Sequence, residues 1–206
     1  MNIAILGSGN IGGTLGKKWA AAGHSISFGA RQPTAAKYQL LLAGVGGIGR
    51  VVTIAEALAA SEAVLLAIPG AAVAGLLAEH GPALNGKIIL DATNRVGQAE
   101  INSLAAIAAA APEASLYRAF STLGWENFET PRIGGEQVDL FFCGDDGAAR
   151  AAVETLITDI GLRPVYVGGR EQVGVIDGLT RLWFALVFGQ QRGRRLAFKM
   201  LTEQPA

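Results

Sequence analysis

A glycine-rich turn near the amino terminus restricts the fold of this chain more than any other feature of its sequence. The segment Gly7–Gly12 reads G-S-G-N-I-G and follows a short apolar run, Asn2–Leu6. Residues 9–22 have apolar residues at helical spacing, and a second apolar run follows at Ser25–Phe28. A strand, a tight glycine turn, a helix and a second strand within about 30 residues predict a β-α-β unit with parallel strands.

Each glycine of this turn has its own physical role. Gly7 makes the tight turn, Gly9 leaves the backbone open to a close ligand, and Gly12 lets the helix pack close to the strand. The first turn of the helix offers unpaired N–H groups and a partial positive charge. The turn therefore predicts a pyrophosphate site, and hence a dinucleotide.

The rest of the chain alternates between strand and helix patterns, which predicts an α/β doubly wound (Rossmann) sheet, mostly parallel. A capping box, Thr53-x-x-Glu56, opens one short helix. Further strands are expected near Val51 and at Ala63–Ile68, Lys87–Leu90, Leu116–Phe120, Val138–Cys143 and Pro164–Val167, and further helices at 33–42, 99–111 and 148–160. Residues 171–201 are expected to be mostly helical. The pair Gly168-Gly169 suggests two parts, a Rossmann domain at 1–168 and a small helical extension at 169–206.

Composition excludes several classes of protein. Lys+Arg and Asp+Glu number 17 each, so the basic excess typical of a nucleic-acid binder is absent. The single cysteine, Cys143, and two histidines, His24 and His80, argue against an internal disulfide and a metal site. The amino terminus lacks a basic leader, and the longest apolar stretch is broken at Pro69-Gly70. We expect a cytoplasmic protein with no nucleic-acid or membrane partner.

The positive charges gather at the amino terminus. The first 55 residues hold no Asp or Glu, and their cations are Lys17, Lys18, Arg31, Lys37 and Arg50. NAD sites normally place a carboxylate at the end of the second strand, where it binds the ribose hydroxyls. Here that position reads F-G-A-R, ending at Arg31, which suits the 2′-phosphate of NADP. The sequence therefore predicts NADP(H) as the cofactor.

Two further loops should lie along the cofactor. Ala67-Ile68-Pro69 follows the fourth strand, and Asn94 follows the fifth and should approach the nicotinamide. Asp91 and Asn94 are equally suited to turn formation or helix capping. The predicted cofactor-binding residues are Gly7, Ser8, Gly9, Asn10, Ile11, Gly12, Arg31, Ala67, Ile68, Pro69 and Asn94.

No catalytic acid or base can be identified. His24 lies in a turn before the second strand, His80 lies at a helix end, and neither Lys87 nor Lys199 has a motif around it. An alcohol dehydrogenase needs a group that takes the hydroxyl proton. Its absence favours hydride exchange with another redox cofactor, because the cofactors then carry the chemistry.

The segment after the sixth strand is the predicted acceptor site. Its residues are Ser121, Thr122, Leu123, Gly124 and Trp125. Trp125 suits stacking on a flat ring or packing in a core or interface. An apolar stripe at Leu179, Leu182, Trp183, Leu186 and Val187 indicates core or a dimer interface. A basic cluster at Arg192, Arg194, Arg195 and Lys199 is either a solvated face or a site for an acidic cofactor tail.

With these motifs the sequence resembles the NADP oxidoreductases that depend on the deazaflavin coenzyme F420. The resemblance lies in NIAILGSGNIGGTLGKKWAAAGHSISFGAR, VLLAIPGAAV, LYRAFSTLGWENF and FFCGDD, and it covers nearly the whole chain. It implies a Rossmann domain with a helical carboxyl-terminal part, a homodimer, and direct hydride transfer between NADPH and the deazaflavin. It also implies phosphate contacts by Ser8, Gly9, Asn10 and Ile11, and a 2′-phosphate contact by Arg31. The chain departs from the family pattern at Ala30, where a serine is frequent.

Three functions remain open from the sequence. The first is an NADPH-dependent oxidoreductase with a deazaflavin or flavin-like acceptor, and the second is an NADPH reductase of a metal ion or of a small imine or carbonyl compound. The third is a non-catalytic NADPH-binding redox sensor. An anaerobic panel of acceptors separates all three.

Overall fold

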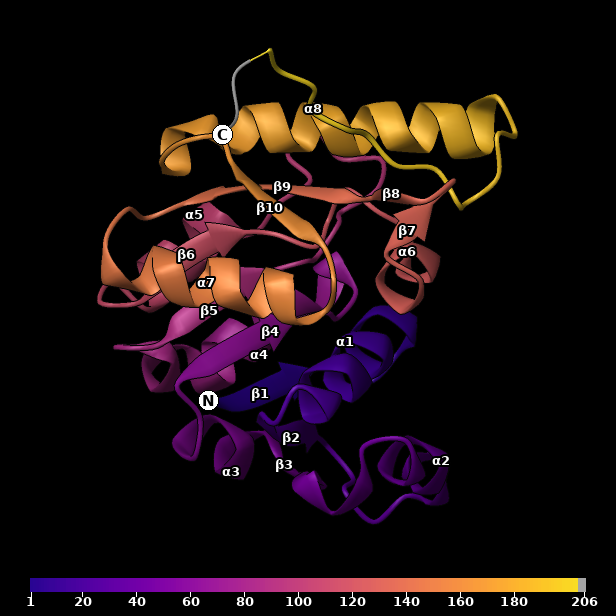
Figure 1. Ribbon diagram of the computed structural model, residues 1–206. Helices are drawn as coiled ribbons and strands as arrows, with labels where there is room; N and C mark the ends of the chain where they lie inside the picture. Colours follow the sequence, from indigo (N-terminus) through magenta and orange to yellow (C-terminus); the bar gives the residue numbers. More distant parts are fainter. Residues whose placement is uncertain (204–206) are drawn as a thin grey trace.

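A computed structural model describes residues 1–203 and has an eight-stranded sheet with helices on both faces (Figure 1). The spatial order of the strands is β10-β9-β6-β5-β4-β1-β2-β3. Their bounds are β1 Asn2–Leu6, β2 Ser25–Ala30, β3 Gly49–Thr53, β4 Ala63–Leu66, β5 Ile88–Asp91, β6 Ser115–Arg118, β9 Asp139–Gly144 and β10 Arg163–Tyr166. The predicted doubly wound α/β class is confirmed.

One junction in the sheet is antiparallel. The six strands from β6 to β3 run parallel, whereas β9 pairs with β6 in the opposite direction and β10 runs parallel to β9. The segment between β6 and β9 holds the short helix α6, Trp125–Glu129, and a hairpin of β7, Arg132–Ile133, and β8, Glu136–Gln137. The chain thus reverses direction between β6 and β9 without the long helical crossover that a parallel pair requires.

Strand β1 divides its side chains between two cores. Ile3 and Ile5 enter the core beneath α1 and α7, whereas Ala4 and Leu6 enter the core beneath α3, α4 and α5. This is why an unbroken apolar run forms a strand buried on both faces. The helices are α1 Asn10–Ala21, α2 Gln39–Ala43, α3 Ile54–Ala59, α4 Val73–His80, α5 Leu104–Ala110, α7 Ala148–Asp159 and α8 Val173–Phe184. The capping box at the start of α3 is present as predicted.

Three predicted helices are shorter than expected. The segment 33–42 forms a 3-10 turn, Ala36–Tyr38, and then α2, which ends at Ala43 where Gly44 follows. In place of a helix over 99–111, α5 starts only at Leu104. The prediction that 171–201 is mostly helical is wrong beyond Gly189, where a π-helical turn ends. Residues 190–203, the C-terminal strap, have no regular secondary structure.

Hydrogen bonds hold the C-terminal strap against α6 and β9. The Arg195 guanidinium donates to the carbonyls of Glu126, Thr130 and Arg132, and the Met200 N–H donates to Asp139. These bonds join backbone groups of the strap and of the segment around α6 and β7 to side chains, in place of the ladder that a helix would supply. The predicted basic cluster is therefore largely engaged within the chain: Arg194 pairs with Glu126 and Lys199 lies near Glu136.

Strand register aligns one row of residues across the sheet. Leu6 of β1 lies beside Leu66 of β4, which lies beside Asp91 of β5, which lies beside Arg118 of β6. The chain leaves each of these four strands just after this row, so four loops meet at one edge. Strands β2 and β3 lie on one side of β1, and β4, β5 and β6 lie on its other side. The order of the strands therefore reverses between β1 and β4, which is the topological switch point.

Candidate functional site

The glycine turn sits at the switch point and is locked by its neighbours. Gly7 has a φ of +109°, and a Cβ there would overlap the Ala67 carbonyl group. A Cβ at Gly12 would overlap the carbonyl oxygen of Gly7. The turn thus packs directly on the loop after β4, which brings Ala67 and Ile68 beside it. The geometry leaves no room for larger residues at Gly7 or Gly12.

Gly9 differs from Gly7 and Gly12 because the space beside its Cα is open. A Cβ at Gly9 would have no heavy atom within 4 Å, and the residue is exposed just before α1. It is the N-cap of α1 with extended backbone, and no side chain caps the helix. The first N–H groups of α1 therefore remain available to an anion. Open space at this glycine fits a ligand that approaches the backbone.

We predict that Gly9→Val separates binding from folding. The valine side chain would enter the space where a pyrophosphate approaches, so the Kd for NADPH should rise at least tenfold, which corresponds to about 1.4 kcal/mol. The melting temperature should stay within about 2 °C, because the added Cβ meets no protein atom within 4 Å and the residue is exposed. Fluorescence titration with NADPH and thermal unfolding measure the two effects. Gly12→Ala is the matched contrast, in which the clash lies inside the protein and stability itself should fall; equal Kd values for wild type and Gly9→Val would contradict the assignment.

Arg31 lies at the far side of the switch point, directly after β2. It is exposed, and no hydrogen bond or ion pair of its side chain occurs within residues 1–203. The end of β2 pairs with the end of β3. The first carboxylate along the chain after β3 is that of Glu56, in the capping box. The guanidinium is thus free to meet a phosphate beside the adenosine end of a dinucleotide.

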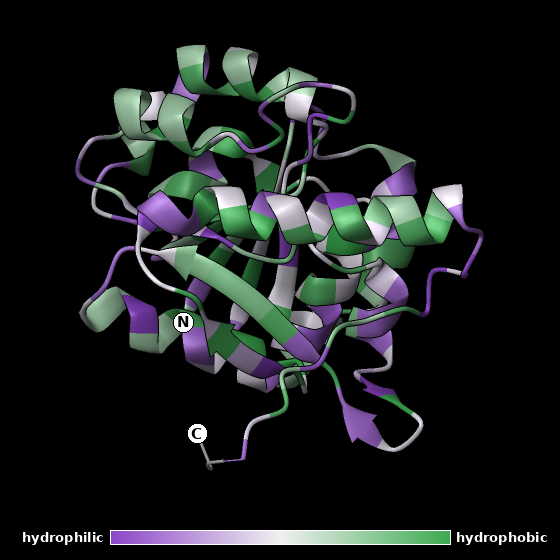
Figure 2. Cartoon of the chain, turned by 90° about the horizontal axis from the view of Figure 1, so that it is seen from above, coloured by the Kyte–Doolittle hydropathy of each residue, from purple (hydrophilic) through white to green (hydrophobic). Residues whose placement is uncertain are grey.

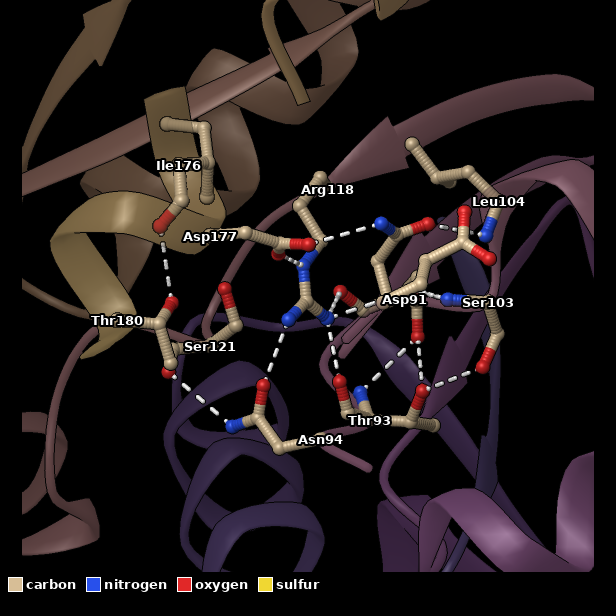
Figure 3. A network of polar contacts seen from close by, with 12 residues as sticks. Asp91, Thr93, Asn94, Ser103, Leu104, Arg118, Ser121, Ile176, Asp177 and Thr180 are labelled. Carbon is tan, nitrogen blue, oxygen red and sulfur yellow. Dashed lines mark hydrogen bonds and ion pairs between the residues drawn. The ribbon is translucent and has the colours of Figure 1, made fainter. Parts of the chain in front are cut away.

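A network of buried polar groups fills the opposite side, beyond the ends of β5 and β6 (Figure 3). Asp91 is fully buried, and both of its carboxylate oxygens are satisfied. One accepts from the N–H and hydroxyl of Thr93, and the other accepts from the N–H of Ser103 and from Arg118. Of the two interpretations left open for Asp91, the structure therefore supports turn formation rather than cofactor contact.

Arg118 is the centre of this network. Its side chain is fully buried, with Nε 3.0 Å from Asp177 Oδ1 and Nη1 3.3 Å from Asp91 Oδ2. Nη1 also donates to the Thr93 carbonyl, and Nη2 donates to Asn94 Oδ1 at 2.6 Å. Asp177 belongs to α8, and its second oxygen accepts from Asn102. One guanidinium thus ties the loop after β5 to the carboxyl-terminal helix.

The network fixes the orientation of Asn94. Its Oδ1 accepts from Arg118, and its Nδ2 donates to the Ser121 carbonyl at 3.3 Å. The amide therefore bridges the loops after β5 and β6, where the sequence placed the nicotinamide. Sequence reasoning missed Arg118, Asp177 and Asn102. The one available signal was a charged residue inside the apolar run L-Y-R-A-F, since a buried charge requires partners.

The loop after β6 carries two buried hydroxyls without partners. Ser121 Oγ and Thr122 Oγ1 are buried and make no hydrogen bond within the described part of the chain. Phe120, just before them, has a φ of +61°, which is rare for a bulky residue. Strained backbone beside unsatisfied polar groups is typical of ligand sites.

The other predicted acceptor residues are distributed differently. Leu123 is buried in the core, and Gly124 is packed against Trp183 and the C-terminal strap. Trp125 is half-buried at the start of α6 and lies beside the glycine turn, where it shares a groove with Ser8, Gly9 and Asn10. Of the five, Trp125 lines a groove, whereas Ser121 and Thr122 are buried with hydroxyls that have no partner within the described residues.

The two histidines lie away from these loops. His24 Nε2 is 2.8 Å from Asp159 of α7, and its Nδ1 is 3.2 Å from the terminal amine of Met1. His80 contacts Glu79 at the end of α4. Among the described residues, no group of three or more His, Cys, Asp or Glu side chains could hold a metal ion.

The single cysteine is predicted to be unreactive in the folded protein. Burial raises the pKa of the Cys143 thiol to about 12, because the thiolate would lose its hydration. Alkylation by iodoacetamide should therefore remain slow between pH 7 and about pH 9, whereas the urea-unfolded chain should react in minutes. Mass spectrometry of timed samples measures both rates. Rapid labelling of the folded protein at pH 8 would show that this strand opens readily and would contradict the prediction.

The apolar stripe of α8 is divided between inside and outside. Trp183 and Val187 are buried, and the Trp183 indole donates to the Leu196 carbonyl of the C-terminal strap. Val175, Leu182 and Phe188 are 57%, 47% and 59% exposed. Figure 2, which views the molecule from the side of α8, shows apolar segments along this helix. Of the predicted stripe, Trp183 and Val187 are therefore core, Leu179 and Leu186 are partly buried, and Leu182 is exposed.

Comparison with known proteins agrees with this geometry. Residues 2–95 match the family described as NADP oxidoreductase, coenzyme F420-dependent. These residues contain the glycine turn, Arg31, the loop after β4 and Asn94. The predicted resemblance to NADP-dependent oxidoreductases is confirmed for this amino-terminal part of the chain.

Solved structures extend the likeness to nearly the whole chain. A crystal structure from Arthrobacter sp. FB24, described as a candidate F420-dependent NADP-reductase, is 26% identical with a TM-score of 0.85 and covers 98% of this chain and 100% of that one. The hypothetical protein SMa0349 from Sinorhizobium meliloti is 27% identical with a TM-score of 0.68 over 82% of this chain and 85% of that one. A reductive aminase from Aspergillus terreus shares the fold, at 24% identity and a TM-score of 0.65; this chain is 92% covered and spans 64% of that one.

Proposed function

We propose that this chain, whose amino-terminal part matches the coenzyme F420-dependent NADP oxidoreductases, transfers hydride between NADP(H) and a deazaflavin or flavin-like acceptor. The pyrophosphate would bind over Gly9 and the first turn of α1, and the 2′-phosphate would bind Arg31. Ala67, Ile68 and Pro69 would lie along the dinucleotide. Asn94 would contact the nicotinamide.

The burial and bonding of the charged side chains near Asn94 support this proposal. Asp91, Arg118 and Asp177 are buried and bound to one another, so none is available to exchange a proton with a substrate. The groups left free there are the hydroxyls of Ser121 and Thr122. Such a site orients reactants but offers no general acid or base. It therefore suits an acceptor that takes its proton from water.

The chain's contribution is then one of binding and alignment. NADPH, when bound, supplies the hydride. Asn94, held at both ends of its amide, fixes one edge of the nicotinamide, and the Ser121 and Thr122 hydroxyls are suited to hold a carbonyl group of the cofactor or the acceptor. Trp125 offers an aromatic face near the same loop.

An anaerobic acceptor panel tests this proposal. Protein and NADPH are mixed with a deazaflavin, a flavin, a ferric chelate or a cyclic imine, and the nicotinamide absorbance band is followed. Consumption of NADPH with the deazaflavin or flavin alone is the expected result. Turnover with the imine or the ferric chelate instead would overturn it in favour of the second function. Absence of turnover with every acceptor would leave the redox sensor.

We also propose a cytoplasmic homodimer with no nucleic-acid or membrane partner, divided at Gly168-Gly169 into a cofactor-binding part, 1–168, and an extension, 169–206. The stretch Arg170–Gly189 is long and apolar enough to cross a membrane by length and composition alone. It carries Asp177 in a buried ion pair, which supports a place in a folded protein. Its exposed apolar side chains Val175 and Leu182, seven residues apart and so on one face of α8, would meet a second copy. Light scattering of the wild type and of Leu182→Glu tests this: the variant should be monomeric, and a monomeric wild type would overturn the dimer.

A further inference from the structure

Unsatisfied polar atoms gather in one short segment of the chain. Within residues 1–203, five buried side-chain oxygen or nitrogen atoms have no hydrogen-bond partner. Four of these five belong to the 121–127 segment: Ser121 Oγ, Thr122 Oγ1, Glu126 Oε2 and Asn127 Oδ1. A buried polar atom without a partner costs about 1–3 kcal/mol, so this segment is destabilised in the arrangement that the structure shows.

The C-terminal strap lies over the second half of this segment. The Asn127 amide nitrogen donates to the carbonyls of Arg194 and Leu196, at 3.1 and 3.3 Å. A Cβ at Gly124 would lie 3.1 Å from the Arg194 carbonyl oxygen, so the strap backbone rests directly on this glycine. In Figure 1 the strap, in yellow, leaves the end of α8 and runs back along that helix. The strap therefore separates at least the part of the segment from Gly124 to Asn127 from solvent.

The strap is attached by polar bonds rather than by buried apolar surface. None of residues 190–203 is buried. The exposed Arg195 guanidinium supplies three bonds, to backbone carbonyls between residues 126 and 132, and Arg194 forms an ion pair with Glu126. An exposed ion pair is worth about 0–1 kcal/mol, and segments with few buried apolar contacts open at low free energy. The strap can therefore leave its position while the sheet stays folded.

Strained backbone precedes the 121–127 segment and begins the strap. Phe120 and Gln191 are the two non-glycine residues with a positive φ within residues 1–203, at +61° and +53°. Gly193 has a φ of +80°, and the π-helical turn Ala185–Gly189 ends just before the strap. Left-handed residues and π-helical turns are concentrated at functional and moving parts of proteins. The start of the strap thus has the features of a hinge.

We infer that the C-terminal strap is a displaceable cover, whose first part, residues 190–198, lifts about Gln191 and Gly193 and exposes the 121–127 segment to the cofactor or the acceptor. This inference rests on the proposed function, which places one of these ligands against Ser121 and Thr122. The far end of the strap stays in place, because the Met200 N–H donates to the buried Asp139 carboxylate.

Opening of the strap determines what the unsatisfied atoms can bind. Asn127 Oδ1 and Glu126 Oε2 only accept hydrogen bonds, so a ligand that meets them must bring N–H or O–H donors. Such a ligand binds only the fraction of molecules whose strap is open, and its apparent Kd rises as that fraction falls. A variant with a more loosely held strap should therefore bind the ligand more tightly than wild type.

A cysteine placed beneath the strap reports its opening. Thr122→Cys puts a thiol at a position that is 1% exposed, and the buried Cys143 of β9 serves as the internal reference. Labelling by iodoacetamide at pH 8 is followed by mass spectrometry in Thr122→Cys and in Thr122→Cys/Arg195→Gln. Loss of the three Arg195 bonds should speed labelling at position 122 about tenfold and change that of Cys143 by less than about twofold. Ser121→Cys is the second reporter if Thr122→Cys does not fold.

Arg181→Gln is the matched control for this measurement. Arg181 is also an exposed guanidinium that donates to a backbone carbonyl, that of Ala99, but it lies on α8 and outside the strap. Its replacement should change labelling at position 122 by less than about twofold. Equal acceleration by Arg181→Gln and Arg195→Gln, or equal labelling with and without Arg195, would overturn the cover.

A binding measurement separates this inference from the proposed function. The fluorescence anisotropy of a deazaflavin without a charged tail is titrated with NADP⁺-saturated protein, which needs no turnover. Arg195→Gln should lower the Kd by about threefold or more, because more of the molecules are open. An equal or higher Kd would overturn the cover. Failure of the deazaflavin to bind, together with Arg195-dependent labelling at position 122, would overturn the proposed function alone.

Discussion

Arg118→Met is expected to lower the free energy of unfolding by about 3–5 kcal/mol. The substitution keeps the volume of the side chain but leaves the carboxylates of Asp91 and Asp177 buried without their cation. It also removes the donors to the Thr93 carbonyl and to Asn94. Urea unfolding followed by circular dichroism measures the change. Stability within about 1 kcal/mol of wild type would show that the carboxylates are solvated or protonated in the fold.

Asp177→Asn is the companion to this variant, because Arg118→Met could fail to fold. The amide preserves the shape of the side chain and keeps one acceptor for Arg118 Nε, but its amide nitrogen then faces the Asn102 donor, so that hydrogen bond is lost. Its expected cost is smaller, about 1–3 kcal/mol, since the hydrogen bonds lose one charge. Arg118→Lys should fall between the two, because an ammonium cannot span Asp177, Asp91 and Asn94 at once.

The same pair of variants has a consequence for the proposed cofactor site. Asn94 depends on Arg118 for the orientation of its amide, whereas Gly9 and Arg31 do not contact the network. A folded Asp177→Asn protein should thus keep its affinity for adenosine 2′,5′-bisphosphate while losing affinity for complete NADPH. Equal losses for both ligands would point to general loosening of the fold.

Local periodicity explains why the cofactor half of the molecule could be predicted. The strand Asn2–Leu6, the glycine turn and α1 follow one another within a single β-α-β unit, and each is set by residues close in sequence. The capping box at Thr53 and Glu56 is local for the same reason. The parallel order of the first six strands then follows from the connections, which are too long for hairpins.

Long-range pairing explains what could not be predicted. Arg118 meets Asp177 across 59 positions of sequence, and the antiparallel β6–β9 pair depends on α6 and a hairpin that have no strong sequence signal. Residues 190–203 contain helix-favouring residues. Hydrogen bonds that Arg195 donates and that Asp139 accepts nevertheless hold them without regular secondary structure. Tertiary contacts override helix propensity where the propensity amounts to tenths of a kcal/mol per residue.

Arg31→Glu is expected to raise the Kd for NADPH by one to two decades, or about 1.4–2.8 kcal/mol. The exposed guanidinium directly after β2 would be replaced by a carboxylate, which attracts the 2′-hydroxyl of NADH but repels the 2′-phosphate of NADPH. The Kd for NADH should therefore change much less. Because Arg31 makes no bond within the described residues, stability should change by less than about 0.5 kcal/mol. Titration with both dinucleotides measures the ratio.

Arg50→Glu provides the matched control for charge. It changes the net charge of the same amino-terminal segment by the same amount, but Arg50 sits on β3 and donates to Ser27 rather than facing the end of β2. If position matters, Arg50→Glu should shift the Kd for NADPH less than about threefold, because a charge beyond the Debye length of about 8 Å is screened. The two variants could instead weaken NADPH binding equally, or Arg31→Glu could weaken the binding of NADPH and NADH alike. In either case the acid-free segment acts through its overall electrostatic field. The 2′-phosphate would then be recognised by no single residue, and the cofactor preference would have to arise from the summed potential of all five cations.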